Sequence, residues 1–123
     1  YRKGVVTAVK PSYFYAYEKF NDALHSLATG KGDVRHRLWY AYSHFHTVHN
    51  KHLPEQLQID YELVLKQLTR FGPVIGRDGK VLRGPVEETL NRIHNSTGSK
   101  IAERILHIYH HLNWLYNEVN REP

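Results

Sequence analysis

Apolar residues recur with helical spacing through the last part of the chain, between Thr97 and Asn120. They follow one another at steps of three or four residues and therefore share one helix face; these are Ile101, Ile105, Ile108, Leu112, Leu115 and Val119. No proline interrupts the segment, and a side-chain oxygen of Ser96 or Thr97 is expected to cap its start. The pattern predicts one long amphipathic helix whose apolar face needs other helices to cover it.

The same spacing predicts three further amphipathic helices earlier in the chain. Their apolar faces contain Tyr13, Ala16, Tyr17, Phe20, Leu24 and Leu27 in the first, Val34, Leu38, Ala41, Phe45 and Val48 in the second, and Leu57, Tyr61, Val64, Leu68 and Phe71 in the third. A shorter pattern begins at Pro85 and keeps the phase of the last helix. We interpret these last two segments as one rod that is broken near residues 95–98.

Local signals set the expected ends of these helices. Ser12 is expected to cap the first helix, and Gly30 is expected to end it in the left-handed conformation. Asp33 is expected to cap the second helix, which fades through residues 49–53, and Pro54 is expected to open the third. The connections are short, so successive helices should run antiparallel.

Residues 74–83, VIGRDGKVLR, indicate a small hairpin, because apolar pairs flank an Asp-Gly turn signal. The predicted fold is an all-α antiparallel bundle of four or five helices with a short hairpin-like insertion between helices three and four. It is expected to be a single domain over residues 1–123, with an extended N-terminal arm at 1–11 and a basic hairpin at 72–84.

The amino-acid composition limits which kinds of site and which locations are expected for this chain. The chain has 123 residues, a net charge of +5 with its histidines neutral, and no cysteine. The absence of cysteine excludes a disulfide framework and a thiolate metal site and fits a reducing compartment, so we expect a cytoplasmic location. No run of about 18 apolar residues occurs, so no membrane span is expected. Two segments combine glycine with lysine, Gly30-Lys31-Gly32 and Thr97-Gly98-Ser99-Lys100, but neither has the spacing of a phosphate loop. No cofactor is expected.

Basic side chains gather in two connections that the predicted topology brings together. In an up-down bundle the first and third connections lie at the same end. We call their six cations the basic pole; they are Lys31, Arg35, Arg37, Arg77, Lys80 and Arg83. Set against Asp33 and Asp78, they predict a positive field suited to phosphate. A surface that binds nucleic acid is one interpretation, and two ordinary solvated loops are the other.

Some apolar residues fall outside the main helical stripes. Ile59 and Leu63 lie on the side of the third helix opposite its core stripe. Trp114 lies off the stripe of the last helix, and Trp39 and Tyr40 flank that of the second. Such residues suit a protein partner or a homodimer. Packing at the edge of the core is the alternative.

Histidines cluster on the second and the last predicted helices. His107 and His111 are one helical turn apart and are weak candidates for a metal site. No H-E-x-x-H pattern supplies further ligands, so solvated or tyrosine-paired histidines are the default and no metal is expected.

Arginine and histidine also recur at a spacing of catalytic interest. Five or six residues separate the members of three pairs: Arg37 with His44, Arg104 with His110, and Arg104 with His111. This resembles the R-x(4–6)-H signature of HEPN-type ribonucleases, which are small helical domains that usually dimerise. The resemblance implies that arginine holds the scissile phosphate while histidine shuttles the proton. The resemblance covers only the arginine and the histidine of each pair. The residue after the arginine is Leu38 or Ile105, where the family has a polar residue.

These patterns favour a non-catalytic helical accessory module that binds nucleic acid or a protein partner through the basic pole. One alternative is a HEPN-like ribonuclease that uses Arg104 with His110 or His111. The other is a pure protein-interaction or dimerisation subunit, in which the positive charge is incidental.

Overall fold

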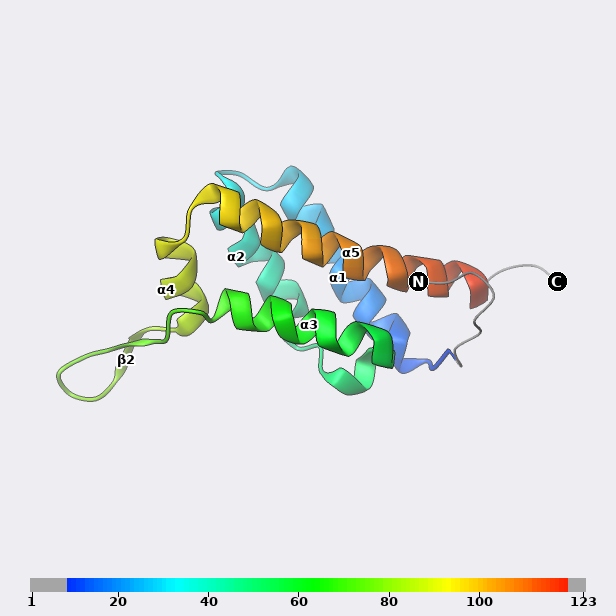
Figure 1. The fold of residues 1–123 in the computed structure, drawn as a ribbon, viewed down its shortest axis with the longest axis horizontal. Coiled ribbons are helices and arrows are strands. Elements are labelled where there is room, and N and C mark those ends of the chain that lie inside the picture. Colours follow the sequence, from blue (N-terminus) through cyan, green and yellow to red (C-terminus); the bar gives the residue numbers. More distant parts are fainter. Residues whose placement is uncertain (1–8, 120–123) are drawn as a thin grey trace.

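Helices make up most of the computed structural model, which describes residues 9–119 (Figure 1). Its elements are α1 (Ser12–Thr29), α2 (Val34–Phe45), the 3-10 helix η1 (Asn50–His52), α3 (Glu55–Leu68), β1 (Val74–Ile75), β2 (Val81–Arg83), α4 (Pro85–Arg92) and α5 (Asn95–Val119). Helices α1 and α3 run toward the hairpin end of the molecule, and α2 and α5 run back (Figure 1). The predicted all-α antiparallel bundle, with a short hairpin between its third and fourth helices, is confirmed.

Large apolar side chains fill the space between the long helices, and α5 packs against α1, α2 and α3. Three rings from three helices meet at the centre. Phe20 and Phe45 stack with their centroids 5.0 Å apart. Tyr61 meets Phe20 edge-on at 5.9 Å and Phe45 at 6.1 Å. All three side chains are buried, so these contacts join α1, α2 and α3 in one core.

The hydroxyl of Tyr61 gives this core a polar contact. It lies 2.7 Å from the carbonyl oxygen of Val48 and 3.1 Å from that of Phe45, where the chain leaves α2. Burial raises the pKa of Tyr61, so the phenol keeps its proton and donates. The hydroxyl therefore holds α3 against the end of α2.

The boundaries around α1 and α2 differ from the sequence prediction. Helix α1 begins at Ser12 with Pro11 in the capping position, so the predicted Ser12 cap is wrong. The Ser12 hydroxyl instead donates to the carbonyl oxygen of Lys51 at 3.2 Å, which connects α1 to η1. Helix α2 stops at Phe45 rather than fading through residues 49–53, and η1 forms there separately.

Glycine ends α1 for a steric reason. Gly30 is extended, with φ −66° and ψ 159°, so the predicted left-handed conformation is wrong. A Cβ atom at this position would lie 2.5 Å from the carbonyl oxygen of Ser26, which excludes other residues. Gly32 takes the left-handed conformation instead, with φ 85°. The connection between α1 and α2 thus depends on both glycines.

The break between α4 and α5 lies at residues 93–94, earlier than predicted. Helix α5 already begins at Asn95, so the predicted cap at Ser96 or Thr97 is wrong. Gly98 is buried where α5 passes the start of α2, and a Cβ atom there would lie 2.9 Å from Val34 Cγ1. Most of the predicted N-terminal arm, residues 1–11, and the side chain of Val119 fall outside the described part of the chain. Within residues 9–119, none of the helices combines the length and the apolar character that a membrane span requires.

Replacing Tyr61 by phenylalanine tests the polar contact in the core. Tyr61→Phe keeps the ring but removes the donor to the carbonyl oxygen of Val48, while that of Phe45 keeps the N–H of Val48, so we expect a loss of about 1–2 kcal/mol in the free energy of unfolding. Urea denaturation measures this, with Tyr40→Phe, at an exposed position of α2, as the matched control. Equal effects of the two substitutions would contradict a structural role for the Tyr61 hydroxyl.

Candidate functional site

The hairpin projects from the helical body at one end of the molecule (Figure 1). We call residues 72–84 the hairpin arm. Its turn follows from the sequence: Gly79 takes a positive φ of 80°, and Asp78 Oδ1 accepts a hydrogen bond from the backbone N–H of Lys80 at 3.0 Å. The strands pair as predicted, with a bulge between Val74 and Ile75.

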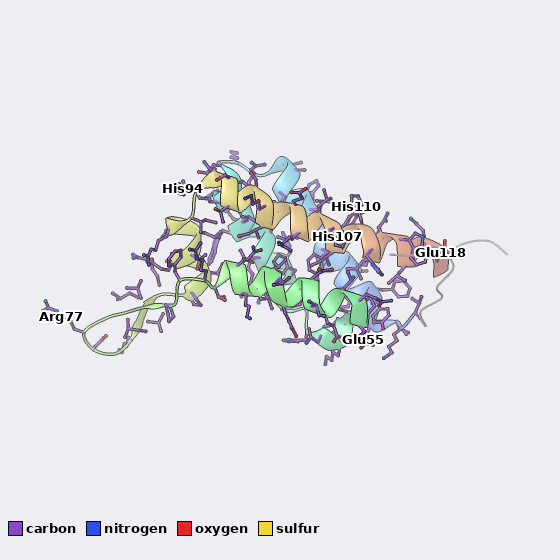
Figure 2. The ribbon with its side chains drawn as sticks, in the orientation of Figure 1. Glu55, Arg77, His94, His107, His110 and Glu118 are labelled. Carbon is purple, nitrogen blue, oxygen red and sulfur yellow. The ribbon has the colours of Figure 1, made fainter. Side chains whose placement is uncertain are left out.

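Two cations lie at the tip of the hairpin arm. Arg77 and Lys80 are exposed, and neither side chain has a hydrogen bond or an ion pair with residues 9–119. Figure 2 shows the Arg77 side chain at the far end of the arm, pointing away from the helices. A guanidinium and an ammonium group in this position can both reach an external anion without breaking an internal contact.

A further basic cluster lies at the base of the arm. Glu88 on α4 pairs with Arg83 at 2.9 Å and with Arg92 at 3.8 Å. The guanidinium of Arg92 lies 4.0 Å from the centroid of the Phe71 ring, and that of Arg70 lies 5.1 Å from it. Sequence reasoning missed Arg70 and Arg92. The spacing of Glu88 and Arg92, four residues apart on a helix, was the signal that could have found the second.

The arm is attached to α4 through backbone contacts of Phe71. The N–H of Phe71 donates to Thr89 Oγ1 at 3.0 Å, and the Thr89 hydroxyl donates to the Phe71 carbonyl oxygen at 3.1 Å. Thr89 is fully buried. This reciprocal pair fixes where the arm leaves the helical body.

Two arginines of the basic pole are used inside the fold. Arg35 pairs with Asp33 at 3.0 Å and donates from Nη1 to the carbonyl oxygen of Ile93 at 3.1 Å, just after α4. Arg37 donates from Nη1 to the carbonyl oxygen of Leu27 at 2.7 Å, near the end of α1. Both side chains therefore stabilise helix ends, where backbone carbonyls lack helical partners.

Asp33 shows the capping that its sequence position predicts. Its Oδ1 accepts a hydrogen bond from the N–H of His36 at 3.2 Å, which confirms the predicted cap of α2. The hydrogen bond from Arg35, together with the one from the His36 backbone, lowers the pKa of Asp33. The carboxylate is thus already occupied by contacts of its own helix.

The structure divides the six predicted cations into two groups. The connection before α2, with Lys31, and the hairpin arm both lie in the half of the molecule away from the C-terminal end of α5 (Figure 1). Lys31 is exposed like Arg77 and Lys80. Arg83 joins the structural group with the two arginines of α2, because it pairs with Glu88.

An open hollow of about 720 Å³ lies beside Lys31, between α2 and α4. The connection before α2 and that helix contribute Lys31, Gly32, Asp33, Arg35, His36 and Trp39, and α4 contributes Glu87, Leu90 and Asn91. Trp39 is 41% exposed and presents an indole at this surface. The sequence pattern placed Trp39 beside the core stripe but gave no signal for the α4 wall.

The predicted partner-binding residues differ in exposure. Ile59 is 68% exposed and Leu63 is 39% exposed, one turn apart on α3. Trp114 on α5 is only half-buried. The outer face of α3 therefore presents apolar surface to solvent, as the second stripe indicated.

The histidines of α5 lie in different environments. His111 is buried, although it lies outside the apolar stripe that the sequence pattern gives for this helix. Its pKa is lowered to about 4, mainly by burial; the neighbouring His107 contributes to this lowering, and Asp60 opposes it. His107 is exposed and has its Nε2 3.6 Å from Asp60 Oδ2 on α3. Among the residues that the structure describes, no group of three or more histidine, cysteine or acidic side chains could hold a metal ion.

The HEPN-like pairs stay a prediction. Arg104 and His110 are exposed on α5, and Figure 2 shows His110 on the outer side of that helix. The lowered pKa of His111 keeps its imidazole uncharged at pH 7, so it is not an imidazolium that could act as general acid. The other pair is in contact with α1: Arg37 with a backbone carbonyl, and His44 with Ser26 Oγ at 3.1 Å.

No family model, curated protein or solved structure matches this chain.

The burial of His111 predicts a dependence of stability on pH. The folded protein holds the pKa of this group near 4, whereas the ordinary value is 6.5, so the unfolded chain binds a proton first as the pH falls. Stability should decrease between about pH 6.5 and pH 4, by up to about 3 kcal/mol.

The variant His111→Leu has no imidazole at this position, so its free energy of unfolding should not show the decrease between about pH 6.5 and pH 4 that His111 causes. Urea denaturation at a series of pH values compares it with the wild type and with His25→Gln, which changes an exposed histidine of α1. The predicted result is a flatter pH profile for His111→Leu alone. Parallel profiles for His111→Leu and the wild type would show that the burial of this imidazole is not coupled to folding.

Proposed function

We propose that this chain is a non-catalytic accessory module that binds nucleic acid through the basic pole, with the hairpin arm as its principal contact. The observation that carries the proposal is the projection of the arm from the helical body with Arg77 and Lys80 exposed at its tip. Cations without internal partners can replace the counterions of a phosphate backbone at little structural cost.

The charge around the arm supports the same function. Between Arg70 and Arg92 the chain has five basic and three acidic side chains. One of the acidic groups, Glu88, is paired with two arginines, and another, Asp78, accepts a hydrogen bond from the turn backbone. The field in front of the arm is therefore positive, which favours encounter with a polyanion.

The two groups of cations have different roles in this proposal. Lys31, Arg77 and Lys80 contact phosphate directly. The arginines of α2 and Arg83 instead hold the helix ends and the base of the arm in place. The phosphate contacts of the first group would position the protein on the nucleic-acid backbone and carry little sequence information.

Removing the two tip charges tests the proposal. Arg77→Ala with Lys80→Ala should weaken binding to a labelled 20-nucleotide strand or 20-base-pair duplex roughly tenfold at low salt, and should reduce the salt slope by about one to two units. Fluorescence anisotropy at a series of salt concentrations measures both. Lys66→Ala with Lys100→Ala, at exposed positions on α3 and α5, is the control with the same change in charge.

The control fixes how the result is interpreted. An equal loss of affinity in both double variants would mean that net charge alone matters and that the arm has no special part. Absence of binding by the wild type at low salt, or binding that salt does not weaken, would contradict the proposed function outright.

A second candidate is self-association through α3. The exposure of Ile59 and Leu63, one turn apart on the outer face of this helix, is the specific observation that favours it. A second copy of the chain would cover these side chains by a symmetric contact between two α3 helices.

Light scattering tests this second candidate. The wild type should have the mass of a dimer, and Ile59→Lys with Leu63→Lys should be monomeric, because the contact would then bring like charges together. Ala28→Lys with Asn117→Lys places the same charge at exposed positions of α1 and α5 and should stay dimeric. A monomeric wild type would end this candidate without affecting nucleic-acid binding.

A further inference from the structure

The hollow between α2 and α4 has two walls whose positions are fixed by internal contacts. Along α2 and its cap, His36 and Trp39 follow Asp33 at intervals of three residues, so they line one face. The guanidinium of Arg35 crosses from Asp33 to the carbonyl oxygen of Ile93 and connects the two helices. The hollow therefore exists before any ligand binds.

The glycine at the rim of the hollow has a defined role. Gly32 has a positive φ of 85°, and a Cβ atom there would lie 3.1 Å from the His36 ring. This conformation lets the imidazole pack against the turn, where it also meets the Tyr40 ring at 5.1 Å. The rim is thus shaped by backbone geometry and by two neighbouring rings.

The chemistry of the walls suits a flat ring that carries polar edge groups and an anion. Trp39 offers an exposed indole for stacking, and buried Leu90 offers apolar contact. Glu87 and Asn91 supply a carboxylate and an amide, the groups that hydrogen-bond to base edges. Lys31, exposed at the margin, can meet a phosphate. A volume of about 720 Å³ is of the size that holds a small organic ligand.

We propose that this hollow binds the base of an unpaired nucleotide, which stacks on Trp39 while Lys31 contacts its phosphate. Bases in a duplex are paired and stacked on each other, so only an unpaired base can enter. The inference rests on the proposed function and narrows it: the hairpin arm supplies contact with any phosphate backbone, and the hollow makes the module prefer single strands.

Tryptophan fluorescence tests stacking directly. The chain has two tryptophans, so Trp114→Phe leaves Trp39 as the only one, and excitation at wavelengths that tyrosine does not absorb selects its emission. Adding an oligothymidylate of ten nucleotides to this variant should quench the emission of Trp39, since an indole stacked on a base loses fluorescence. A ten-residue abasic strand of the same charge is the matched probe, and it should quench little.

Affinity gives the second readout. The wild type should bind oligothymidylate roughly tenfold more tightly than the abasic strand, and Trp39→Ala should remove that difference. Trp39→Phe should keep part of it, because a phenyl ring still stacks. Binding to a duplex of matched charge should be the same for Trp39→Ala and the wild type. Circular dichroism confirms that each variant is folded, and the fluorescence readout needs no change at Trp39.

The outcomes separate this inference from the proposed function. If the wild type binds the oligothymidylate and the abasic strand equally, or if Trp39 emission does not change on binding, the hollow does not take a base. Salt-dependent binding through the hairpin arm would stand in that case. If neither strand binds at low salt, both proposals are overturned. A preference for oligothymidylate that Trp39→Ala abolishes supports the inference.

Discussion

The ring contacts among Phe20, Phe45 and Tyr61 are the interaction on which the arrangement of this molecule depends. They join α1, α2 and α3 at the centre of the core. Burial of each large ring contributes about 1.5–3 kcal/mol, and each favourable ring pair adds about 0.5–1.5 kcal/mol. Because these helices are held antiparallel, the connection that carries Lys31 and the hairpin arm lie in the same half of the molecule.

The structure shows that the six cations of the basic pole differ in their contacts. The sequence presents six similar cations in two connections, yet three of them have partners that keep them within the fold. Arg35 reaches the carbonyl oxygen of Ile93, 58 positions away in the chain. No pattern of local spacing predicts such a contact, because it depends on how α2 and α4 approach each other. Of the six, Lys31, Arg77 and Lys80 remain available to an external phosphate.

Periodicity predicted the bundle well for a physical reason. A stripe of apolar residues at helical spacing reports which face is removed from water, and the stripes of all four long helices are mostly buried. The hairpin was also predictable, because its turn needs a glycine with positive φ and Gly79 supplies it. The Asp33 cap followed from the same kind of local chemistry.

The errors arose where tertiary contacts override local preference. Ser12 turns from its own helix to Lys51. Position 30 needs glycine because a Cβ atom there would collide with the carbonyl oxygen of Ser26, and not because of its backbone conformation. His111 is polar but adjoins the core stripe, and the packing of α5 buries it. The hollow combines residues 31–39 with residues 87–91, so it becomes visible only when the two helices are placed together.

The most direct test of the central claim is to map the contact surface by nuclear magnetic resonance, titrating the isotope-labelled protein with a single-stranded oligonucleotide at low salt. We expect amide shifts to concentrate in residues 31–39, 76–83 and 87–91 and to leave the outer face of α3 unchanged. Shifts confined to α3 and α5, or none at all, would contradict it.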